Sequence, residues 1–293
     1  MMGVNLKQCA INTATLGFQC PIEQSIEAVA AAGFGGIAPW RREIEGQNVS
    51  RIAKRIRDAG LAVTGYCRST YLPSLTREGL SANIESNRRA LEDAAVLGAD
   101  SFVMVVGGPP KGSKDIDGAR AQVAEGTAQL LEHRKKLGVK IALEPLHPVY
   151  AAERSCLTLL SEALDMCQQI EGPVPAPSLG VCLDVYHVWW DPNLKRDIAR
   201  AGVENRIFGF HLCDWLVPTS DVLNDRGMMG DGVIDIPSIH AQVKNANYKG
   251  FVEVEIFSDK NWWKRPVAEI LDVCAARLST SLVGAVGLEP TTR

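Results

Sequence analysis

Short apolar runs that alternate with amphipathic segments constrain most strongly what this chain of 293 residues can fold into. The runs are continuously apolar, which is typical of parallel strands buried on both faces, and glycine follows several of the amphipathic segments, as it does at helix ends. We therefore expect strands at residues 9–13, 35–38, 61–66, 101–106, 139–144, 180–184, 207–211 and 251–255. We expect helices at residues 21–32, 48–59, 81–97, 117–137, 157–170, 193–201, 236–245 and 262–278.

These elements form eight strand–helix units, which predict an α/β fold with one (β/α)8 TIM-barrel domain over residues 1–278. A doubly wound open sheet gives similar local patterns. It would normally place a glycine-rich phosphate turn after its first strand, and none stands there. Residues 279–293 end in GAVGLEPTTR, which has no periodicity, so we expect an unstructured tail outside the fold.

Acidic or imidazole side chains lie at the ends of four successive expected strands. They are Glu144, Asp184, His211 and Glu255. The carboxyl ends of barrel strands carry the chemistry, and three carboxylates held together are costly unless a cation neutralises them. We predict that the four share one divalent ion, with Mn²⁺ favoured and Mg²⁺, Co²⁺ or Zn²⁺ also suited to such ligands. Taken singly, a strand-end carboxylate is more often a helix cap or an ion-pair partner.

Two further histidines lie near these positions. His147 is three residues past Glu144, so we expect it close to the ion but not bound to it, where it could act as a catalytic base. The alternative is a loop histidine that only caps a backbone group. For His187 two functions remain open, contact with the substrate and support of a ligand.

An arginine and a tryptophan complete the predicted site. Arg226 lies in the long polar loop after the seventh strand, and it is either a substrate clamp or an ion-pair partner of Asp225 or Asp231. Trp40 follows the second strand, where its flat ring could stack on a sugar. The alternative for Trp40 is packing between loops.

Charge and composition exclude several classes of partner. The formal net charge of −3 disfavours nucleic acid and anionic membranes, which require a basic surface. No apolar run approaches the roughly 20 residues of a membrane span, and the first residues contain no signal-peptide core. The eight cysteines are scattered without a CxxC pair. We therefore expect a cytoplasmic protein with reduced thiols and a small-molecule substrate.

Five sequence motifs resemble those of the xylose isomerase-like TIM-barrel superfamily, which includes sugar phosphate isomerases and epimerases. The resemblance covers residues 9–278 and rests on EPLHP, LDVYH, FHLCDW, DRGMMGDG and VEVE. It implies a metal-dependent enzyme that enolises a keto-sugar. By the same resemblance the metal ligands are Glu144, Asp184, His211 and Glu255. His187 and Arg226 are then contacts of the metal site or the substrate.

Within this superfamily, EPLHP together with DVYHVWWDP is most similar to the barrel (alpha) subunit of bacterial C-glycoside deglycosidases. That resemblance implies a carbon–carbon lyase acting on 3-keto C-glycosides, in a hetero-oligomer with a small β-sandwich subunit. A base such as His147 would remove the C2 proton, and the enolate would expel the C1 substituent, which is β to the carbonyl.

Three other functions stay open from the sequence. Reprotonation of the same enolate gives a keto-sugar isomerase or epimerase, of the tagatose/psicose 3-epimerase or hydroxypyruvate isomerase type. An apurinic endonuclease shares the barrel, but five histidines and a net charge of −3 argue against it. A non-enzymatic binding protein would tolerate the loss of Glu144 or His147.

Overall fold

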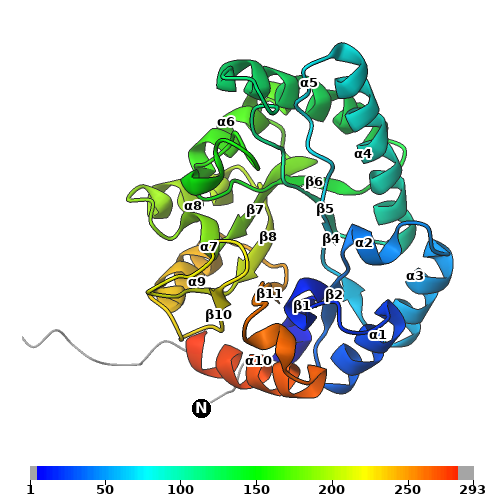
Figure 1. Ribbon diagram of the computed structural model, residues 1–293, viewed down its shortest axis with the longest axis vertical. Coiled ribbons are helices and arrows are strands. Elements are labelled where there is room, and N and C mark those ends of the chain that lie inside the picture. The colour runs from blue at the N-terminus through cyan, green and yellow to red at the C-terminus, as the bar shows by residue number, and fades with distance from the viewer. Residues whose placement is uncertain (1–4, 283–293) are drawn as a thin grey trace, which may run out of the picture.

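The computed structural model describes residues 5–282 and forms a closed barrel of parallel strands surrounded by helices (Figure 1). The barrel strands follow the order β3-β2-β1-β11-β8-β7-β6-β5-β4, so β3 and β4 stand at the two ends of the order. They are β1 (Cys9–Asn12), β2 (Gly36–Ala38), β3 (Ala62–Val63), β4 (Tyr66–Cys67), β5 (Ser101–Met104), β6 (Lys140–Leu143), β7 (Leu179–Asp184), β8 (Ile207–Leu212) and β11 (Val252–Val254). This confirms the predicted (β/α)8 fold.

The expected third strand is divided into two pieces. β3 pairs with β2, and β4 pairs with β5, so together the two pieces close the circle as one strand interrupted at Thr64 and Gly65. The interruption matters for the site because the Thr64 hydroxyl donates a hydrogen bond to a buried carboxylate inside the barrel. The barrel therefore has eight strand positions although nine strand segments are present.

The helices form the outer ring of Figure 1. Their bounds are α1 (Ile22–Ala31), α2 (Arg41–Ile44), α3 (Val49–Asp58), α4 (Arg77–Leu97), α5 (Ile116–Arg134), α6 (Leu160–Glu171), α7 (Val185–Val188), α8 (Leu194–Val203), α9 (Ile236–Asn245) and α10 (Val267–Ser281). Asn48 caps α3 as its type and position suggest, since its side chain accepts from the backbone N–H of Arg51. Among residues 5–282, no helix is long and apolar enough to cross a membrane.

Two helix boundaries differ from expectation. α4 begins at Arg77, earlier than the expected residue 81, because the Thr76 side chain accepts from the backbone N–H of Gly79 and starts the helix there. The last expected helix divides into a 3-10 turn at Trp262–Lys264 and α10, since Pro266 stands at the N-cap. α10 runs through Ser281, so the expected tail is helical from residue 279 to 281, and residues 283–293 lie outside the described part.

The loop after β8 contains a short antiparallel hairpin, β9 (Asp214–Trp215) and β10 (Arg226–Gly227), that we did not expect. The Asp214 carboxylate holds the base of this segment, because it accepts hydrogen bonds from four backbone N–H groups. The donors are those of Trp215, Gly230, Gly232 and Ile234, at 2.9–3.0 Å. The loop that carries Arg226 is therefore fixed at both arms.

Candidate metal centre

The four predicted ligands converge at the carboxyl end of the barrel strands. They come from β6, β7, β8 and β11, which are neighbours in the sheet, and all four are buried. Glu144, Asp184, His211 and Glu255 each offer a ligand atom within 4.8 Å of the others. The strand-end pattern in the sequence therefore predicted a real cluster, although the pattern alone gave no distances.

Two buried atoms at the centre of this cluster have no hydrogen-bond partner. His211 Nδ1 lies 3.3 Å from Glu144 Oε1 and 3.6 Å from Glu255 Oε2. Neither this ring nitrogen nor Glu144 Oε1 forms a hydrogen bond with any described residue. Buried polar atoms are nearly always paired. A lone imidazole nitrogen and carboxylate oxygens that face one space fit a divalent cation.

The raised pKa of Glu144 is also consistent with a cation at this cluster. Burial raises the pKa of Glu144 to about 7, and the nearby Glu255 carboxylate adds to this, although His211 opposes it. The protein without an ion therefore holds these carboxylates together at a cost in free energy. A bound divalent ion would remove that cost.

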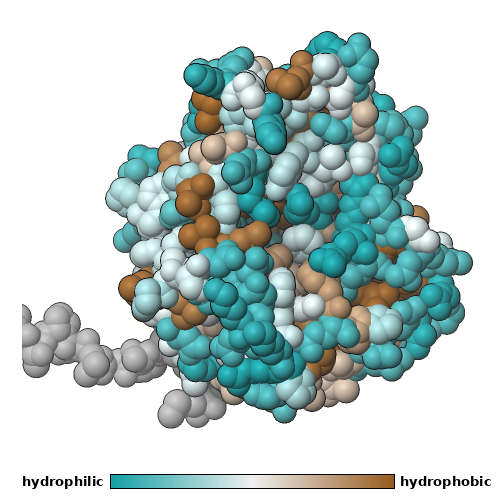
Figure 2. All heavy atoms as spheres, viewed as in Figure 1, coloured by the Kyte–Doolittle hydropathy of each residue, from teal (hydrophilic) through white to brown (hydrophobic). Residues whose placement is uncertain are grey.

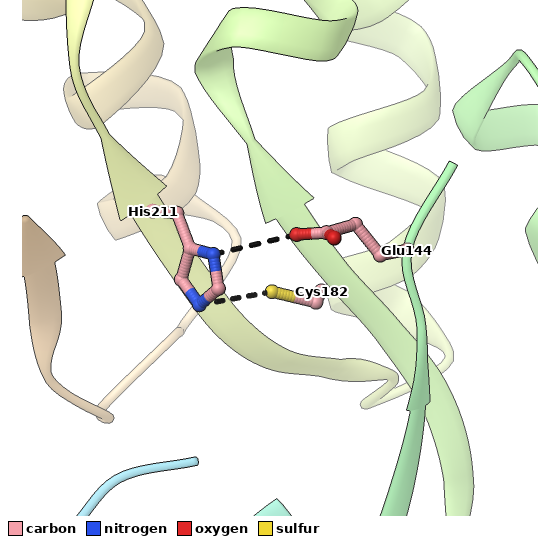
Figure 3. Close-up of side chains that lie close together, drawn as sticks. All are labelled: Glu144, Cys182 and His211. Atoms are coloured by element: carbon pink, nitrogen blue, oxygen red, sulfur yellow. Dashed lines mark hydrogen bonds and ion pairs between the residues drawn. The ribbon is translucent and has the colours of Figure 1, made fainter. Parts of the chain in front are cut away.

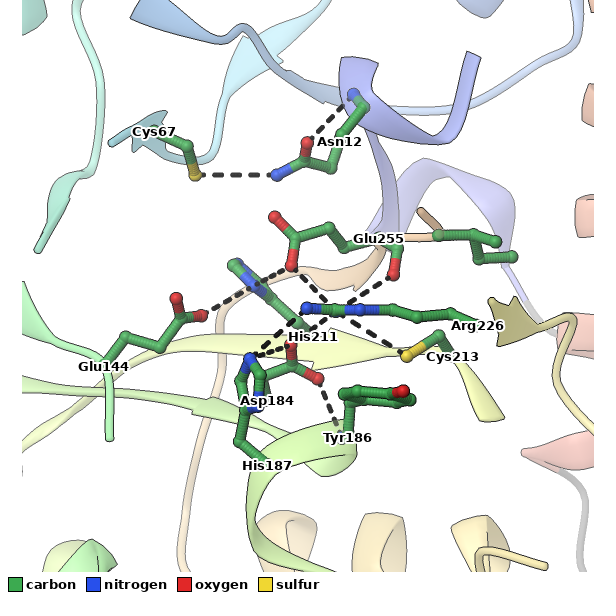
Figure 4. Close-up of polar contacts among 12 residues, drawn as sticks. Asn12, Cys67, Glu144, Asp184, Tyr186, His187, His211, Cys213, Arg226 and Glu255 are labelled. Atoms are coloured by element: carbon green, nitrogen blue, oxygen red, sulfur yellow. Dashed lines mark hydrogen bonds and ion pairs between the residues drawn. The ribbon is translucent and has the colours of Figure 1, made fainter. Parts of the chain in front are cut away.

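Arg226 bridges two of the predicted ligands, as Figure 4 shows. Its Nη1 lies 2.8 Å from Asp184 Oδ2 and 3.2 Å from Glu255 Oε2. Its guanidinium lies over the Tyr186 ring, with Cζ 4.4 Å from the centroid. The alternative of an ion pair with Asp225 or Asp231 is wrong, since Arg226 pairs with acids of the cluster instead.

Both ring nitrogens of His187 face a donor. Nδ1 lies 3.2 Å from the backbone N–H of His147, and Nε2 lies 3.2 Å from Arg226 Nη2 and 3.6 Å from Asp184 Oδ2. Burial lowers the pKa of His187 to about 3, which keeps the ring neutral. His187 also lines the cavity beside the cluster. His187 therefore lies where it could contact a substrate and also where it could support Asp184 as a ligand.

His147 is not where we expected it. Its half-buried ring packs against Trp190 and Trp215, with centroids 5.7 Å and 4.8 Å away, and its Nδ1 accepts from the backbone N–H of Val149 at 3.2 Å. It is not among the residues that line the cavity. The 3-10 turn that follows directs the ring outward, so the backbone-capping alternative describes its position.

The sequence analysis missed Glu253, a second buried carboxylate two residues before Glu255 on the same face of the strand. Its Oε1 lies 3.1 Å from His211 Nε2, and it accepts from Asn12 Nδ2 at 2.9 Å. The orientation of the Asn12 amide is fixed, since its Oδ1 accepts from Trp40 Nε1 at 2.6 Å and from the Ala14 N–H at 3.1 Å.

Burial lowers the pKa of His211, but the negative charges around the ring outweigh this and raise it well above its usual value, so the ring is protonated on both nitrogens without an ion. The hydrogen-bond chain sets its tautomer when a cation takes the place of the Nδ1 proton. Indole nitrogen only donates, so Asn12 presents its NH2 group to Glu253, which must accept. Glu253 as an acceptor places the ring proton of His211 on Nε2 and leaves Nδ1 free for a cation. The signal in the sequence was VEVE, with two acids at a spacing that puts both side chains on one face of a strand.

Cys182 also lies next to His211, and together with Glu144 it forms a second group that could bind a metal (Figure 3). Its Sγ lies 3.3 Å from His211 Nε2, whereas Glu144 faces Nδ1 on the other edge of the ring. Burial raises the pKa of the Cys182 thiol well above its usual value, so the sulfur stays protonated. Cys182 therefore packs against the ring edge that Glu253 already occupies, and we do not count it as a ligand.

The cavity beside the cluster is enclosed by side chains from several strand ends and loops. Its walls comprise Trp40, Cys67, Arg68, Val103, Val105, Glu144, Leu146, Tyr150, Arg154, His187, Leu223, Arg226, Glu255 and Phe257. Trp40 lies edge-on to Phe257, with ring centroids 5.3 Å apart, so the two form an apolar side. In the view of Figure 2 the surface is largely hydrophilic and hollowed near its centre.

The tip of the hairpin loop covers this cavity. Leu223 contributes to the lining, and the neighbouring Val222 carbonyl accepts hydrogen bonds from the hydroxyls of Tyr150 and Tyr186. Tyr150 follows β6 and Tyr186 lies in α7, so two separate segments hold the tip in place. The Val222 carbonyl therefore holds the tip, and two backbone bonds hold the residues after it, from the Asp259 N–H to the Asn224 carbonyl and from the Arg226 N–H to the Phe257 carbonyl.

The family model for the xylose isomerase-like TIM barrel matches residues 26–276. The chain belongs to this family. A family member from Sinorhizobium meliloti 1021, of known crystal structure, is 46% identical, and the superposition covers 94% of this chain and 98% of that one with a TM-score of 0.90. The family match confirms the resemblance that the motifs indicated.

Relatives with named activities are more distant. A 3-dehydroshikimate dehydratase of Pseudomonas putida is 25% identical over 255 residues, which is 84% of this chain but 38% of that protein, so the chain spans well under half of it. A 3-keto-D-glucoside 4-epimerase from E. coli shares the fold, with 21% identity, a TM-score of 0.74, and 93% and 98% of the two chains covered. Xylose isomerase-like barrels thus occur in both dehydratases and epimerases.

Proposed function

We propose that this xylose isomerase-like barrel is a metal-dependent enzyme that removes the proton beside the ketone of a small polyhydroxylated substrate. The observation that carries the proposal is the convergence of four buried ligands, two of whose atoms lack a partner, next to an enclosed cavity. When bound, a divalent ion polarises a ketone oxygen and stabilises enolate charge by several kcal/mol. Mn²⁺ is our proposed ion.

Other residues of the cavity would contact the substrate, hold the ligands or accept the proton. Trp40 and Phe257 offer an apolar face for a ring, and Arg226 fixes Asp184 and Glu255. The group that accepts the proton must reach the cavity. The carboxylates of Glu144 and Glu255 do, whereas both ring nitrogens of His187 are already in contact with donors, the His147 N–H and Arg226 Nη2. We therefore propose a carboxylate as the base and no longer propose His147.

The fate of the enolate decides the reaction class. For a 3-keto C-glycoside, the C2–H bond breaks to give the enolate. The C3 ketone then re-forms, a C1=C2 double bond forms as the bond from C1 to the aglycone breaks, and the aglycone carbon takes a proton. This carbon–carbon lyase reaction, with a small β-sandwich partner subunit, is our first proposal. The relation to a dehydratase supports elimination, since loss of a hydroxyl β to a ketone follows the same sequence of bond changes.

A second candidate is reprotonation without elimination, which makes the chain a keto-sugar isomerase or epimerase. The fold shared with a 3-keto-D-glucoside 4-epimerase favours it. Both candidates require exchange of the proton next to the ketone.

The test incubates the Mn²⁺-loaded protein in D2O with a 3-keto C-glucoside, a 3-keto-glucoside, 3-dehydroshikimate and free ketoses. We expect deuterium beside the ketone of at least one compound. Released aglycone or a dehydrated product then identifies a lyase, and an altered configuration identifies an epimerase. Absence of exchange from all of them, with and without Mn²⁺, would overturn the proposal.

A further inference from the structure

Two arginines line the cavity beside the cluster and are not part of it. Arg68 follows β4, and Arg154 follows the 3-10 turn Pro148–Tyr150. Each guanidinium lies over an aromatic ring, with Arg68 Cζ 4.7 Å from the Tyr71 centroid and Arg154 Cζ 5.4 Å from that of Tyr150. Stacking on rings holds both cations in position without using their N–H groups.

Neither arginine has an anionic partner within residues 5–282. Arg68 makes one side-chain hydrogen bond, a long one of 3.5 Å to the Ser69 carbonyl, and Arg154 Nε is buried with none. Arg226, on the same cavity, pairs with two acids. Two half-buried guanidinium groups that face one cavity, neither in an ion pair within residues 5–282, leave donors available to a ligand there.

The charges around the cavity leave an excess of positive charge. Three carboxylates of the cluster and the buried Glu253 carry four negative charges, and a divalent ion together with Arg226 supplies three positive ones. Arg68 and Arg154 then exceed the remaining negative charge by one. Burial lowers the pKa of Arg68, and the charge of nearby Arg154 contributes in the same direction. Two like charges next to each other in a shielded cavity are stabilised by an anion.

We propose that the substrate carries an anionic group, a carboxylate or a phosphate, which Arg68 and Arg154 bind while the ketone lies at the four-ligand cluster. The planar fork of guanidinium matches both kinds of oxyanion. The inference rests on the proposed function only for the position of the ketone. It divides the possible substrates, since a neutral 3-keto glycoside leaves both arginines unpaired, whereas a keto acid, a keto-sugar phosphate or a 3-keto C-glycoside with an acidic aglycone does not.

The experiment measures equilibrium binding by calorimetry to the Mn²⁺-loaded protein and its variants Arg68→Gln, Arg154→Gln and Arg154→Lys. The probes are 3-dehydroshikimate for a carboxylate, D-ribulose 5-phosphate for a phosphate, and a 3-keto-glucoside as the neutral ketone. Arg57→Gln is the matched control, because Arg57 is exposed on α3 in the outer ring of helices and does not line the cavity. The melting temperature and Mn²⁺ affinity of every variant are measured alongside.

We expect one anionic probe to bind at least about tenfold more tightly than the neutral ketone, and each Gln variant to lose that preference. Arg154→Lys should keep part of it, and Arg57→Gln all of it, with Mn²⁺ affinity undiminished throughout. The carboxylate and phosphate arms identify the kind of anion.

Equal binding of anionic and neutral probes, or an unchanged preference in both Gln variants, overturns the inference. Anion binding that depends on the arginines but is accompanied by no deuterium exchange would leave this inference standing and refute the proposed function. Exchange of neutral ketones without a preference for anions would do the reverse.

Discussion

Glu253 and Glu255 are two buried carboxylates on one strand end, two residues apart, and both face the ring of His211 from inside the barrel. Glu253 faces Nε2 and accepts from Asn12 and Thr64, so its oxygens are supplied with donors. Glu255 faces Nδ1, in the layer where that nitrogen and a Glu144 oxygen have no partner.

This difference assigns Glu253 to a supporting layer, which orients His211, and Glu255 to a binding layer, which faces the proposed ion. Saturated hydrogen bonding fixes a geometry and leaves nothing for a ligand, whereas unpaired buried atoms are stable only if something binds them. Burial alone does not distinguish the two glutamates, and neither does the residue type. The number of donors around each carboxylate does. Four changes test this assignment.

The largest effect is expected from Glu255→Gln. Mn²⁺ affinity should fall by more than about 100-fold. Loss of a residue that only hydrogen-bonds a metal ligand already lowers metal affinity about 10–100-fold, and Glu255 is proposed to bind the ion itself. Calorimetric titration of the purified protein measures it. Glu269→Gln, a change on the exposed surface of α10, is the control and should bind as the unchanged protein does. A greater loss of Mn²⁺ affinity from Glu253→Gln than from Glu255→Gln would show that Glu253 belongs to the binding layer and Glu255 to the supporting layer.

Glu144→Gln should change the pH dependence of stability without an ion. The pKa of Glu144 is raised to about 7 in the folded protein, so between pH 4.5 and 7 the folded state keeps a proton that the unfolded chain releases. The contribution of this group to stability therefore falls by about 3 kcal/mol as pH rises through that range. Urea unfolding in EDTA from pH 4 to 8 should show a flatter profile for the variant. An unchanged profile contradicts this.

Glu253→Gln should weaken Mn²⁺ binding by about 10–100-fold while the barrel stays folded. The amide can donate to His211 Nε2 and so move the ring proton to Nδ1, where it opposes the ion. Nitrogen NMR of the imidazole reports the tautomer. We expect a protonated Nε2 in the unchanged protein and a mixture in the variant. A loss of stability with Mn²⁺ affinity and tautomer unaltered would make Glu253 merely structural.

The smallest effect belongs to Trp40→Phe, which keeps an aromatic ring but removes the N–H that orients Asn12. The free energy of unfolding should fall by about 1 kcal/mol, and Mn²⁺ affinity by only a few-fold. Trp263→Phe is matched to it, since Trp263 Nε1 donates to the Ala14 carbonyl and not to the Asn12 side chain. That variant should lose similar stability and no affinity. Equal losses of affinity in both would break the proposed chain from Trp40 to His211.

The barrel and its four converging side chains could be predicted because both depend on local pattern. Continuous apolar runs mark buried parallel strands, and the barrel brings their ends to one face. The short hairpin at Asp214 was missed because its strands have two residues each, too few to show a period.

Other parts of the site depend on tertiary contacts. His147 has the spacing from Glu144 that a base would have, but the turn after it decides which way the ring points. Arg68 and Arg154 are isolated residues in loops, and their unpaired state is a property of the folded molecule. Glu253 was hidden because a buried acid inside a strand is recognisable only when its partners from β1 and β3 are known.

The Val222 carbonyl has a kinetic consequence. Lifting Leu223 off the cavity breaks two hydroxyl contacts at once, each worth about 1 kcal/mol, in a segment that backbone bonds to Phe257 and Asp259 also hold. Two tyrosines that touch no reacting atom therefore influence how often the cavity opens. Replacing either by phenylalanine is expected to raise the population of the open form, and to raise kcat where departure of product limits turnover.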